Sequence, residues 1–269
     1  MFVTSSNQVG DTSLPGTIRV GDIVSGSSIR CLNVVLDLNG VLCSCEPSWA
    51  AKGCRNTDFS VHSSTLGTVV STKIVKVHPG CAEFLRELST FANVTIWRSM
   101  MRNMTARICD YLFHTCPIKP LRILGQEDCD RIVDRVSGHR TYYKKEEGTQ
   151  KDIFLKTLSK HLFNNHNGLY TASNTVIVDD SPIKNMLNSS ENVLLVHSWP
   201  AGVEDAEKDS TLLGIVLPYF LEMSRSNRNL KEFWDSHGLG RPMLYEDRKT
   251  YTLYKALCSA IESSRIRAR

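Results

Sequence analysis

Residues 33–42 read NVVLDLNGVL, an apolar run that ends in a carboxylate and a glycine. β-Branched and leucine residues without polar alternation are typical of a strand that is buried on both faces, as in a parallel sheet. Such a strand delivers Asp37 to its carboxyl end, and Gly40 lets the chain turn sharply just beyond it. The segment therefore predicts a strand over 33–38 in an α/β protein, with an acidic side chain at the sheet edge where such folds bind ligands.

Apolar segments and amphipathic segments alternate along the rest of the chain. The predicted strands are 33–38, a strand or hairpin over 68–77, 93–97, 121–124, 174–182 and 192–196. The predicted helices are 80–91, 100–113, 151–163 and three segments within 207–263, DSTLLGIVLPYFLEMS, NLKEFWDSH and YTLYKALCSAIESS. This alternation indicates an open, mostly parallel sheet flanked by helices.

Composition suggests three parts along the chain. Residues 1–30 are rich in Ser, Gly and Thr and are expected to form a flexible arm. The α/β domain is expected over 31–200. Residues 201–269 are expected to be a helical C-terminal extension that packs on the same domain.

The charge and the apolar pattern limit the classes of function. A net charge of +4 suits acidic or phosphorylated partners but does not by itself argue for nucleic acid. No apolar stretch approaches the ~20 residues that span a bilayer. The first residues lack the charged and apolar regions of a secretory signal. An intracellular location is expected, nuclear or cytoplasmic, with a mitochondrial one open if a presequence has been removed.

Nine cysteines form an odd, irregular set without a C-x-x-C pair. Such a set favours reduced thiols. Cys43, Cys45, Cys54 and His62 are the nearest approach to a zinc site. Structural zinc usually has two close-spaced ligand pairs, and only one is present, so we do not favour zinc.

Two further acids fall at the end of another predicted strand. Asp179 and Asp180 follow the apolar run TVIV, so they are expected to meet Asp37 in one crevice at the carboxyl ends of the strands. Adjacent carboxylates repel unless a cation neutralises them, and Mg²⁺ prefers such oxygen ligands. Lys151, at the start of the predicted helix 151–163, is a candidate to hold Asp37 and to stabilise charge on a phosphoryl group. Each residue alone has a simpler interpretation as a turn residue, a helix cap or a solvated lysine.

Five segments in chain order resemble one branch of the haloacid dehalogenase (HAD) superfamily. They are VLDLNGVL, VHPGCAEFLREL, VTIWRS, KDI and VIVDDSP. The branch includes small RNA polymerase II C-terminal-domain phosphatases and the phosphatase-like subunit of the mitochondrial presequence translocase, and the segment 225–250 resembles the extension of plant members. The resemblance implies a Rossmann-like HAD fold with a short β insertion in place of a large cap. It also implies a Mg²⁺-dependent phosphatase that acts on phosphorylated Ser or Thr of proteins through an aspartyl-phosphate on Asp37.

The sequence departs from this branch at the position of the general acid/base. The family pattern has Asp there, and this chain has Asn39. An amide neither protonates a leaving alcohol nor activates water, and the loss of such a group typically costs ~10²–10⁴ in rate. The family also uses the backbone carbonyl at this position as a Mg²⁺ ligand, which Asn39 retains. The implied metal ligands are thus Asp37, Asn39, Asp179 and Asp180.

A second departure lies after the predicted strand 93–97. The family has Thr or Ser there to bind the phosphoryl group, and this chain has Arg98 followed by Ser99. Three alternatives stay open: Arg98 binds phosphate bidentately, Arg98 pairs with Asp37 and quenches it, or Ser99 binds phosphate through a shift of one residue.

Three functions compete on this basis. The first is a Mg²⁺-dependent phosphoprotein phosphatase that is impaired by Asn39. The second is a pseudophosphatase, a module that binds phosphopeptides or, like the translocase subunit, basic presequence peptides. The third is an enzyme acting on carbon–halogen or carbon–phosphorus bonds, for which no residue gives positive support.

Overall fold

A computed structural model describes most of the chain between residues 31 and 236. The described residues are 31–48, 58–65, 68–114, 116, 119–134, 142–144, 150–164, 167–199, 208–226, 228–236 and 266–268. None of the helices within these ranges is long and apolar enough to cross a membrane.

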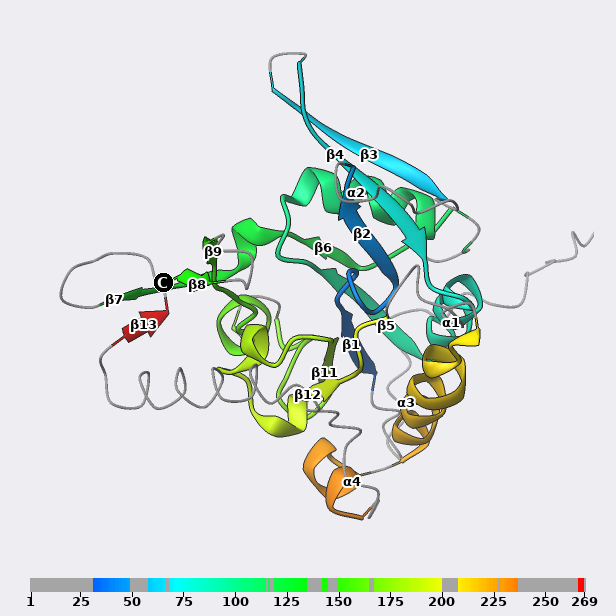
Figure 1. Cartoon of the computed structure of the whole chain (residues 1–269). Coiled ribbons are helices and arrows are strands. Elements are labelled where there is room, and N and C mark those ends of the chain that lie inside the picture. The colour runs from blue at the N-terminus through cyan, green and yellow to red at the C-terminus, as the bar shows by residue number, and fades with distance from the viewer. Residues whose placement is uncertain are drawn as a thin grey trace, which may run out of the picture.

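A five-stranded sheet forms the centre of the molecule (Figure 1). Its strands, in spatial order, are β12 (Val193–Leu195), β11 (Thr175–Asp179), β1 (Leu32–Leu36), β5 (Ala92–Trp97) and β6 (Arg122–Leu124). All four neighbouring pairs are parallel. The chain places β5 and β6 on one side of β1, and then β11 and β12 on the other. The direction of winding therefore changes at β1, which puts the ligand crevice of such a sheet beside Asp37.

Strand β1 is buried on both faces, as its uninterrupted apolar sequence predicts. Val34 and Leu36 belong to one hydrophobic core, and Val35 belongs to another. Neighbouring side chains of a strand point to opposite faces, so a strand between two cores needs apolar residues at every position.

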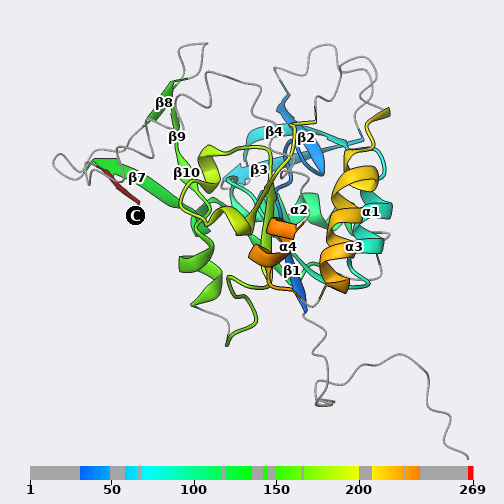
Figure 2. The same cartoon turned by 90° about the horizontal axis from the view of Figure 1, so that it is seen from below.

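Helices cover one face of the sheet. They are α1 (Cys81–Leu88), α2 (Arg102–Leu112), the helical segment Thr211–Val216 that continues into α3 (Leu217–Arg225), and α4 (Leu230–Ser236). Figure 2 shows α1 and α3 side by side. Buried residues of all these helices share the core that contains Val34. The opposite face is covered by the segment around the helical turn Ser159–Phe163, whose Leu162 packs in the core of Val35.

An antiparallel β ribbon follows directly after the turn that leaves β1. It comprises β2 (Cys43–Pro47), β3 (Phe59–Thr65) and β4 (Thr68–Val77) in the order β2-β4-β3, and its β3–β4 end projects from the body of the molecule (Figure 1). The sequence predicted β4, whereas β2 and β3 are not among the strands that it predicted. Both are polar and irregular in sequence, so pairing with β4 rather than local propensity makes them strands.

The predicted helix over 151–163 is wrong in its first part. Residues there form β9 (Gln150–Asp152), paired with β8 (Tyr142–Lys144), and β10 (Phe154–Leu155), paired with β7 (Asp130–Asp134). Strand β7 also pairs with β13 (Ile266–Ala268). Long-range pairing has overridden the helical spacing of the apolar residues. The helix expected over YTLYKALCSAIESS lies outside the described residues.

Candidate functional site

Asp37 lies directly after β1 with its side chain fully buried. Its backbone N–H donates to the carbonyl of Val178 (2.9 Å), which ties the end of β1 to β11. Its Oδ1 accepts a hydrogen bond from the backbone N–H of Leu38 (2.8 Å). The carboxylate is therefore fixed at the switch point of the sheet.

Gly40 forms the turn beyond Asp37 with φ of 83°, a conformation that favours glycine. A Cβ at this position would lie 2.1 Å from Oδ2 of Asp180 and 2.6 Å from Oγ of Ser198. The glycine is thus needed for its backbone conformation and for the close approach of the Asp180 carboxylate.

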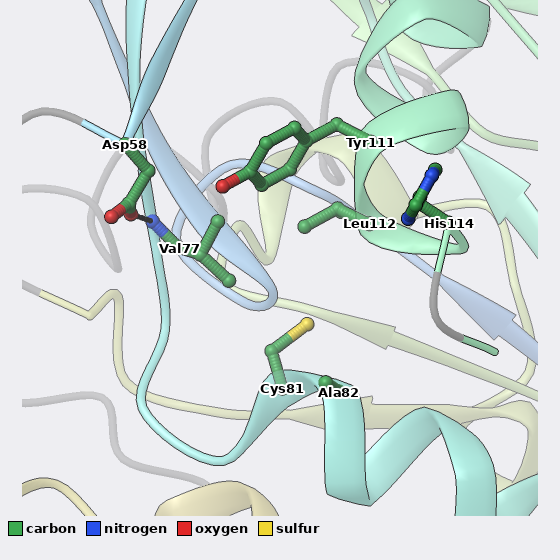
Figure 3. Close-up of a pocket in the computed structure, with 7 residues that line it drawn as sticks. All are labelled: Asp58, Val77, Cys81, Ala82, Tyr111, Leu112 and His114. Atoms are coloured by element: carbon green, nitrogen blue, oxygen red, sulfur yellow. Dashed lines mark hydrogen bonds between the residues drawn. The ribbon is translucent and has the colours of Figure 1, made fainter.

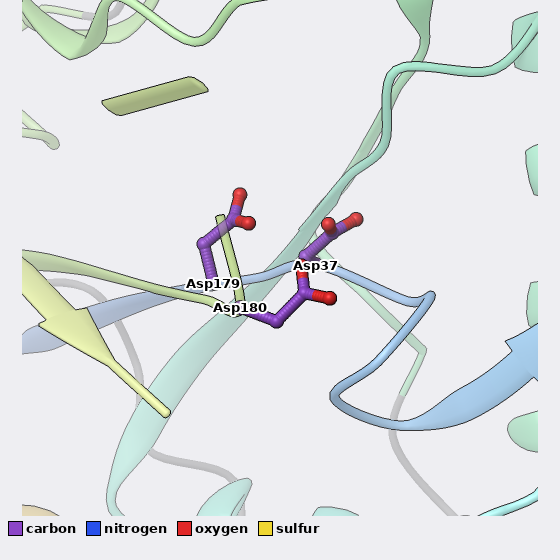
Figure 4. A group of neighbouring side chains, drawn as sticks. All are labelled: Asp37, Asp179 and Asp180. Carbon is purple, nitrogen blue, oxygen red and sulfur yellow. The ribbon is translucent and has the colours of Figure 1, made fainter. Parts of the chain in front are cut away.

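Three carboxylates come together where β1 and β11 end. Figure 4 shows Asp37 from the first strand, with Asp179 and Asp180 from the second. One oxygen from each lies within 4.8 Å of the others. The predicted acidic cluster is therefore present, because the carboxyl ends of adjacent parallel strands meet at one edge.

Lys156 supplies the first cation of this cluster. Its side chain is fully buried, and its Nζ lies 3.2 Å from Oδ1 of Asp37 and 2.6 Å from Oδ2 of Asp179. Charges buried to this degree require such partners.

Lys184 supplies the second cation. It lies in the 3₁₀ turn Ile183–Asn185, just after the sequence Asp-Asp-Ser-Pro. Its Nζ donates to Oδ2 of Asp37 (2.6 Å), Oδ1 of Asp179 (3.3 Å) and Oδ1 of Asp180 (3.5 Å). The two lysines thus approach opposite oxygens of Asp37.

These contacts change the pKa values of the buried groups. Burial by itself would raise the pKa of Asp179, but the ammonium groups of Lys156 and Lys184 outweigh it and hold that pKa well below its usual range. Burial raises the pKa of Asp180 to about 6, and the nearby carboxylates of Asp179 and Asp37 add to the rise despite Lys184. Burial opposes the charge of Lys184, but the three carboxylates raise its pKa well above the ordinary value. Asp180 is thus easier to protonate than Asp179.

Lys151 was the lysine that the sequence predicted for this site. Its backbone lies in β9, opposite Tyr143, and its role at Asp37 stays a prediction. Sequence reasoning missed Lys156 and Lys184, which contact the carboxylates. A signal existed for Lys156, a lone cation inside the apolar run IFLKTL, where a charge needs a buried partner.

Asn39 places its side chain against the ribbon. Its Oδ1 accepts a hydrogen bond from the backbone N–H of Cys45 (2.7 Å), and its backbone bridges to Cys43. The amide therefore holds the turn after β1 against β2, close to Asp37 but with its oxygen already bonded.

Arg98 lies just beyond β5 and is buried, with 6% of its surface exposed. Its Nη1 donates to Sγ of Cys45 (3.0 Å), and among the described residues it forms no ion pair with Asp37. Cys45 Sγ lies 3.5 Å from Cys43 Sγ. The hydrogen bond from Cys43 and the guanidinium of Arg98 together lower the pKa of Cys45, which makes this thiol acidic.

A cavity of about 430 Å³ opens beside these groups. It is lined by Asp37, Asn39, Cys45, Glu46, Pro47, Ser71, Lys73, Arg98, Ser99, Met100, Met101, Met104, Gln126 and Lys184. The central sheet provides one wall, and β2 and β4 of the ribbon provide another. Both residues predicted to bind phosphate after β5, Arg98 and Ser99, therefore face the same cavity as Asp37.

A larger pocket of about 630 Å³ lies elsewhere, between the ribbon and helices α1 and α2 (Figure 3). Its acid, Asp58, accepts a hydrogen bond from the backbone N–H of Val77 (2.6 Å). Its other lining side chains include Tyr111, Cys81 and His114. The described residues that line it include neither paired carboxylates nor a lysine, so the cavity at Asp37 is the better candidate for chemistry.

A model of the NLI interacting factor-like phosphatases matches residues 32–231. The chain belongs to this family. The family is CTD phosphatase-like and HAD-type, and the matched range includes the three acids and both lysines of the cluster. The match continues through α3 into α4, beyond the boundary at residue 200 that the sequence suggested.

Two solved structures of a CTD phosphatase were also found. Fission yeast RNA polymerase II CTD phosphatase Fcp1 bound to beryllium fluoride is 16% identical with a TM-score of 0.43, and the alignment covers 88% of this chain and 64% of that one. Another, "The Structure of Fcp1, an essential RNA polymerase II CTD phosphatase", is 17% identical with a TM-score of 0.42, covering 88% and 63%. This chain thus spans less than two thirds of those chains. No curated protein matches.

The NLI interacting factor-like phosphatase fold implies Mg²⁺, and the donor set only partly suits it. Carboxylate oxygens of Asp37, Asp179 and Asp180 are ligands that Mg²⁺ prefers. However, the Lys184 ammonium already lies within 3.5 Å of an oxygen from each. Mg²⁺ requires oxygen ligands at about 2.0–2.1 Å, which a cationic nitrogen between the same oxygens prevents. The three carboxylates are suitable ligands for Mg²⁺, but the ammonium of Lys184 between them leaves no position for the metal.

Proposed function

We propose that this member of the phosphatase family binds phosphorylated Ser or Thr segments of other proteins without efficient hydrolysis. The phosphoryl group would enter the cavity beside Asp37. The observation that carries the proposal is the surroundings of Asp37. One of its oxygens forms an ion pair with Lys156 and the other accepts a hydrogen bond from Lys184, while the side-chain oxygen of Asn39 accepts one from the Cys45 backbone.

The charges that line the cavity support an anionic ligand. Arg98, Lys73 and Lys184 contribute positive side chains. A phosphate monoester carries close to two negative charges at neutral pH, and Arg and Lys are the usual partners of such groups. Glu46 and Asp37 oppose this attraction, so binding depends on where the phosphoryl group sits among them.

The amide at position 39 supports slow hydrolysis. Asn39 cannot protonate a leaving alkoxide or activate water, a deficit of ~10²–10⁴ in rate. Asp37 is also held by two ammonium groups, which stabilise its negative charge and reduce its tendency to attack phosphorus. The phosphorylated ligand is therefore expected to dissociate from this site faster than it is hydrolysed.

A slow phosphatase is the second candidate, and the position of Asp37 favours it. The carboxylate is retained at the switch point and faces the cavity, where it could form an aspartyl-phosphate. In that case aryl phosphates, whose leaving groups need little protonation, would be hydrolysed faster than alkyl phosphates.

A basic presequence peptide is less well supported. Such a ligand needs exposed acids, whereas the acids of the cluster are buried and paired with Lys156 and Lys184. Of the described residues that line the cavity, Glu46 is the one acid with an exposed side chain.

Calorimetry with the full chain tests the proposal. A phosphoserine peptide, its unphosphorylated twin and a basic amphipathic peptide are titrated in buffer with Mg²⁺ and in buffer with a chelator. We expect the phosphoserine peptide alone to bind, without release of phosphate during the titration. Equal binding of the twin, preference for the basic peptide, or phosphate release at rates typical of phosphatases would overturn it.

A further inference from the structure

The ammonium of Lys184 takes the place that a divalent ion has between clustered carboxylates. Its Nζ donates to one oxygen each of Asp37, Asp179 and Asp180. An ammonium has three N–H donors and no acceptor, so three carboxylates satisfy it completely. The number of donors thus matches the number of acids in the cluster.

The backbone holds Lys184 in this position. The carbonyl of Lys184 accepts a hydrogen bond from the backbone N–H of Lys156 (2.7 Å). Asn185 Nδ2 donates to the carbonyl of Ser181 (3.0 Å), and its backbone N–H donates to that of Pro182 (3.1 Å). These bonds fix the turn that follows β11, so the side chain of Lys184 extends back over the carboxyl end of β11.

Charge balance gives the reason for this arrangement. Asp37 and Asp179 are fully buried, and Asp180 is 14% exposed. Three carboxylates so close together cannot be buried without cations. Lys156 reaches Asp37 and Asp179, while among the described residues only Lys184 also reaches Asp180.

We propose that Lys184 is the resident cation of the cluster, so that the chain maintains its acidic site without a divalent metal. An ion and the ammonium cannot occupy the same point, because each needs the same oxygens and they repel each other. In the cluster of Asp37, Asp179 and Asp180, the position of a metal ion is therefore taken by the Lys184 ammonium. This inference concerns the cluster alone and does not depend on phosphate binding.

Mn²⁺ binding, followed by electron paramagnetic resonance with the chelator-treated full chain, tests the inference. The wild type is expected to leave millimolar Mn²⁺ free. Lys184→Met keeps the apolar stem and removes the ammonium, so this variant should bind one Mn²⁺ at least tenfold more tightly than the wild type. Lys184→Met combined with Asp180→Asn should lose that site. The matched control, Lys231→Met, removes an exposed lysine paired with Asp235 in α4 and should behave as the wild type.

Thermal unfolding with and without Mn²⁺ covers the case in which Lys184→Met is poorly folded. The inference then requires that Mn²⁺ raise the Tm of this variant by several degrees more than that of the wild type. Two results would overturn it: tight Mn²⁺ binding by the wild type, or a folded Lys184→Met that gains neither Mn²⁺ affinity nor Mn²⁺-dependent stability. Neither readout involves phosphate, so failure of phosphopeptide binding is a separate result.

Discussion

Lys156 and Lys184 are joined by a backbone hydrogen bond of 2.7 Å, while their side chains contact opposite oxygens of Asp37. The two segments that carry them lie far apart from β1 in the sequence but close at the ends of the central strands. Asn188 strengthens the pair, because its Nδ2 donates to the carbonyl of Lys156 (2.6 Å). The position of each ammonium therefore depends on the other, so a substitution of one lysine is expected to affect the contacts of both.

Lys156→Met is expected to lower the free energy of unfolding by about 3–5 kcal/mol. It removes one of the two ammonium groups shared by the buried carboxylates of Asp37 and Asp179 and leaves them with Lys184. Urea unfolding followed by circular dichroism measures the change. Lys231→Met is the control and should leave the midpoint unchanged. A loss below about 1 kcal/mol for Lys156→Met would show that the pair is not a structural unit.

Gly40→Ala is expected to destabilise the chain more than Gly168→Ala does. Both glycines have positive φ, 83° and 78°, so each substitution carries a backbone cost of about 1–2 kcal/mol. Only at Gly40 would the added Cβ meet Asp180, whereas Gly168 has nothing within 4 Å. The difference between the two midpoints in urea therefore reports the contacts with Asp180 and Ser198. Equal losses would mean that the side chains of Asp180 and Ser198 move aside at no cost.

Cys45 is expected to contribute pH-dependent stability. Its pKa in the folded chain is lowered by Cys43 and by Arg98, below the ~8.5 of an ordinary thiol. A group whose pKa falls on folding stabilises the fold above its unfolded pKa, and this contribution is lost as the pH decreases through the folded value. Thiolate absorbance of the wild type minus that of Cys45→Ser should report the titration, and Arg98→Met should move it to higher pH. A Cys45 signal that appears only above the ordinary thiol range would contradict this expectation.

Lys73→Met is expected to weaken binding of a phosphoserine peptide, because Lys73 lines the cavity from β4. Glu46→Gln should strengthen it, since an opposing charge is removed. Both effects should shrink with added salt, as expected for partly exposed charges. Lys76→Met, three residues along the same strand and outside the cavity lining, is the matched control. If all three variants bind alike, the phosphoryl group does not enter this cavity.

Asn39→Asp alone is expected to leave hydrolysis of an aryl phosphate near background. The same substitution combined with Lys184→Met should raise it by ~10²–10⁴-fold in Mg²⁺ buffer, the usual effect of a general acid/base. Asp at this position can still accept the hydrogen bond from Cys45, so the turn should persist. Phosphate release measures both variants. A full gain from Asn39→Asp alone would indicate that Lys184 does not obstruct the site.

The sequence predicted the central sheet well because its strands are buried on both faces. Runs such as NVVL and TVIV are typical of the middle of a parallel sheet, so β1 and β11 and the acids that follow them were predictable. The same reasoning failed for β2 and β3, which are strands only because β4 pairs with them. It also failed for β10, where pairing with β7 replaced the expected helix.

The lysines were harder to predict than the acids for a related reason. An acid at a strand end is placed by the strand itself, whereas a long side chain reaches its partner from a segment whose path must already be known. The sequence indicates Lys151 because a helix is predicted to begin there, and that helix is absent at residues 150–155. Lys184 lies in a short turn, where no periodicity indicates that the chain folds back over β11.

The ribbon of β2, β3 and β4 gives the cavity a wall that is separate from the central sheet. Pro47, Ser71 and Lys73 lie on that wall, while the buried charges lie at the strand ends on the other side. Substitutions of these three ribbon residues are therefore expected to change binding of the proposed phosphorylated segment while leaving the lysine–aspartate cluster in place. The buried side chains of the same ribbon, such as Val61 and Val75, belong to the hydrophobic core. The ribbon residues that line the cavity can therefore be redesigned for a new ligand while these core residues are kept.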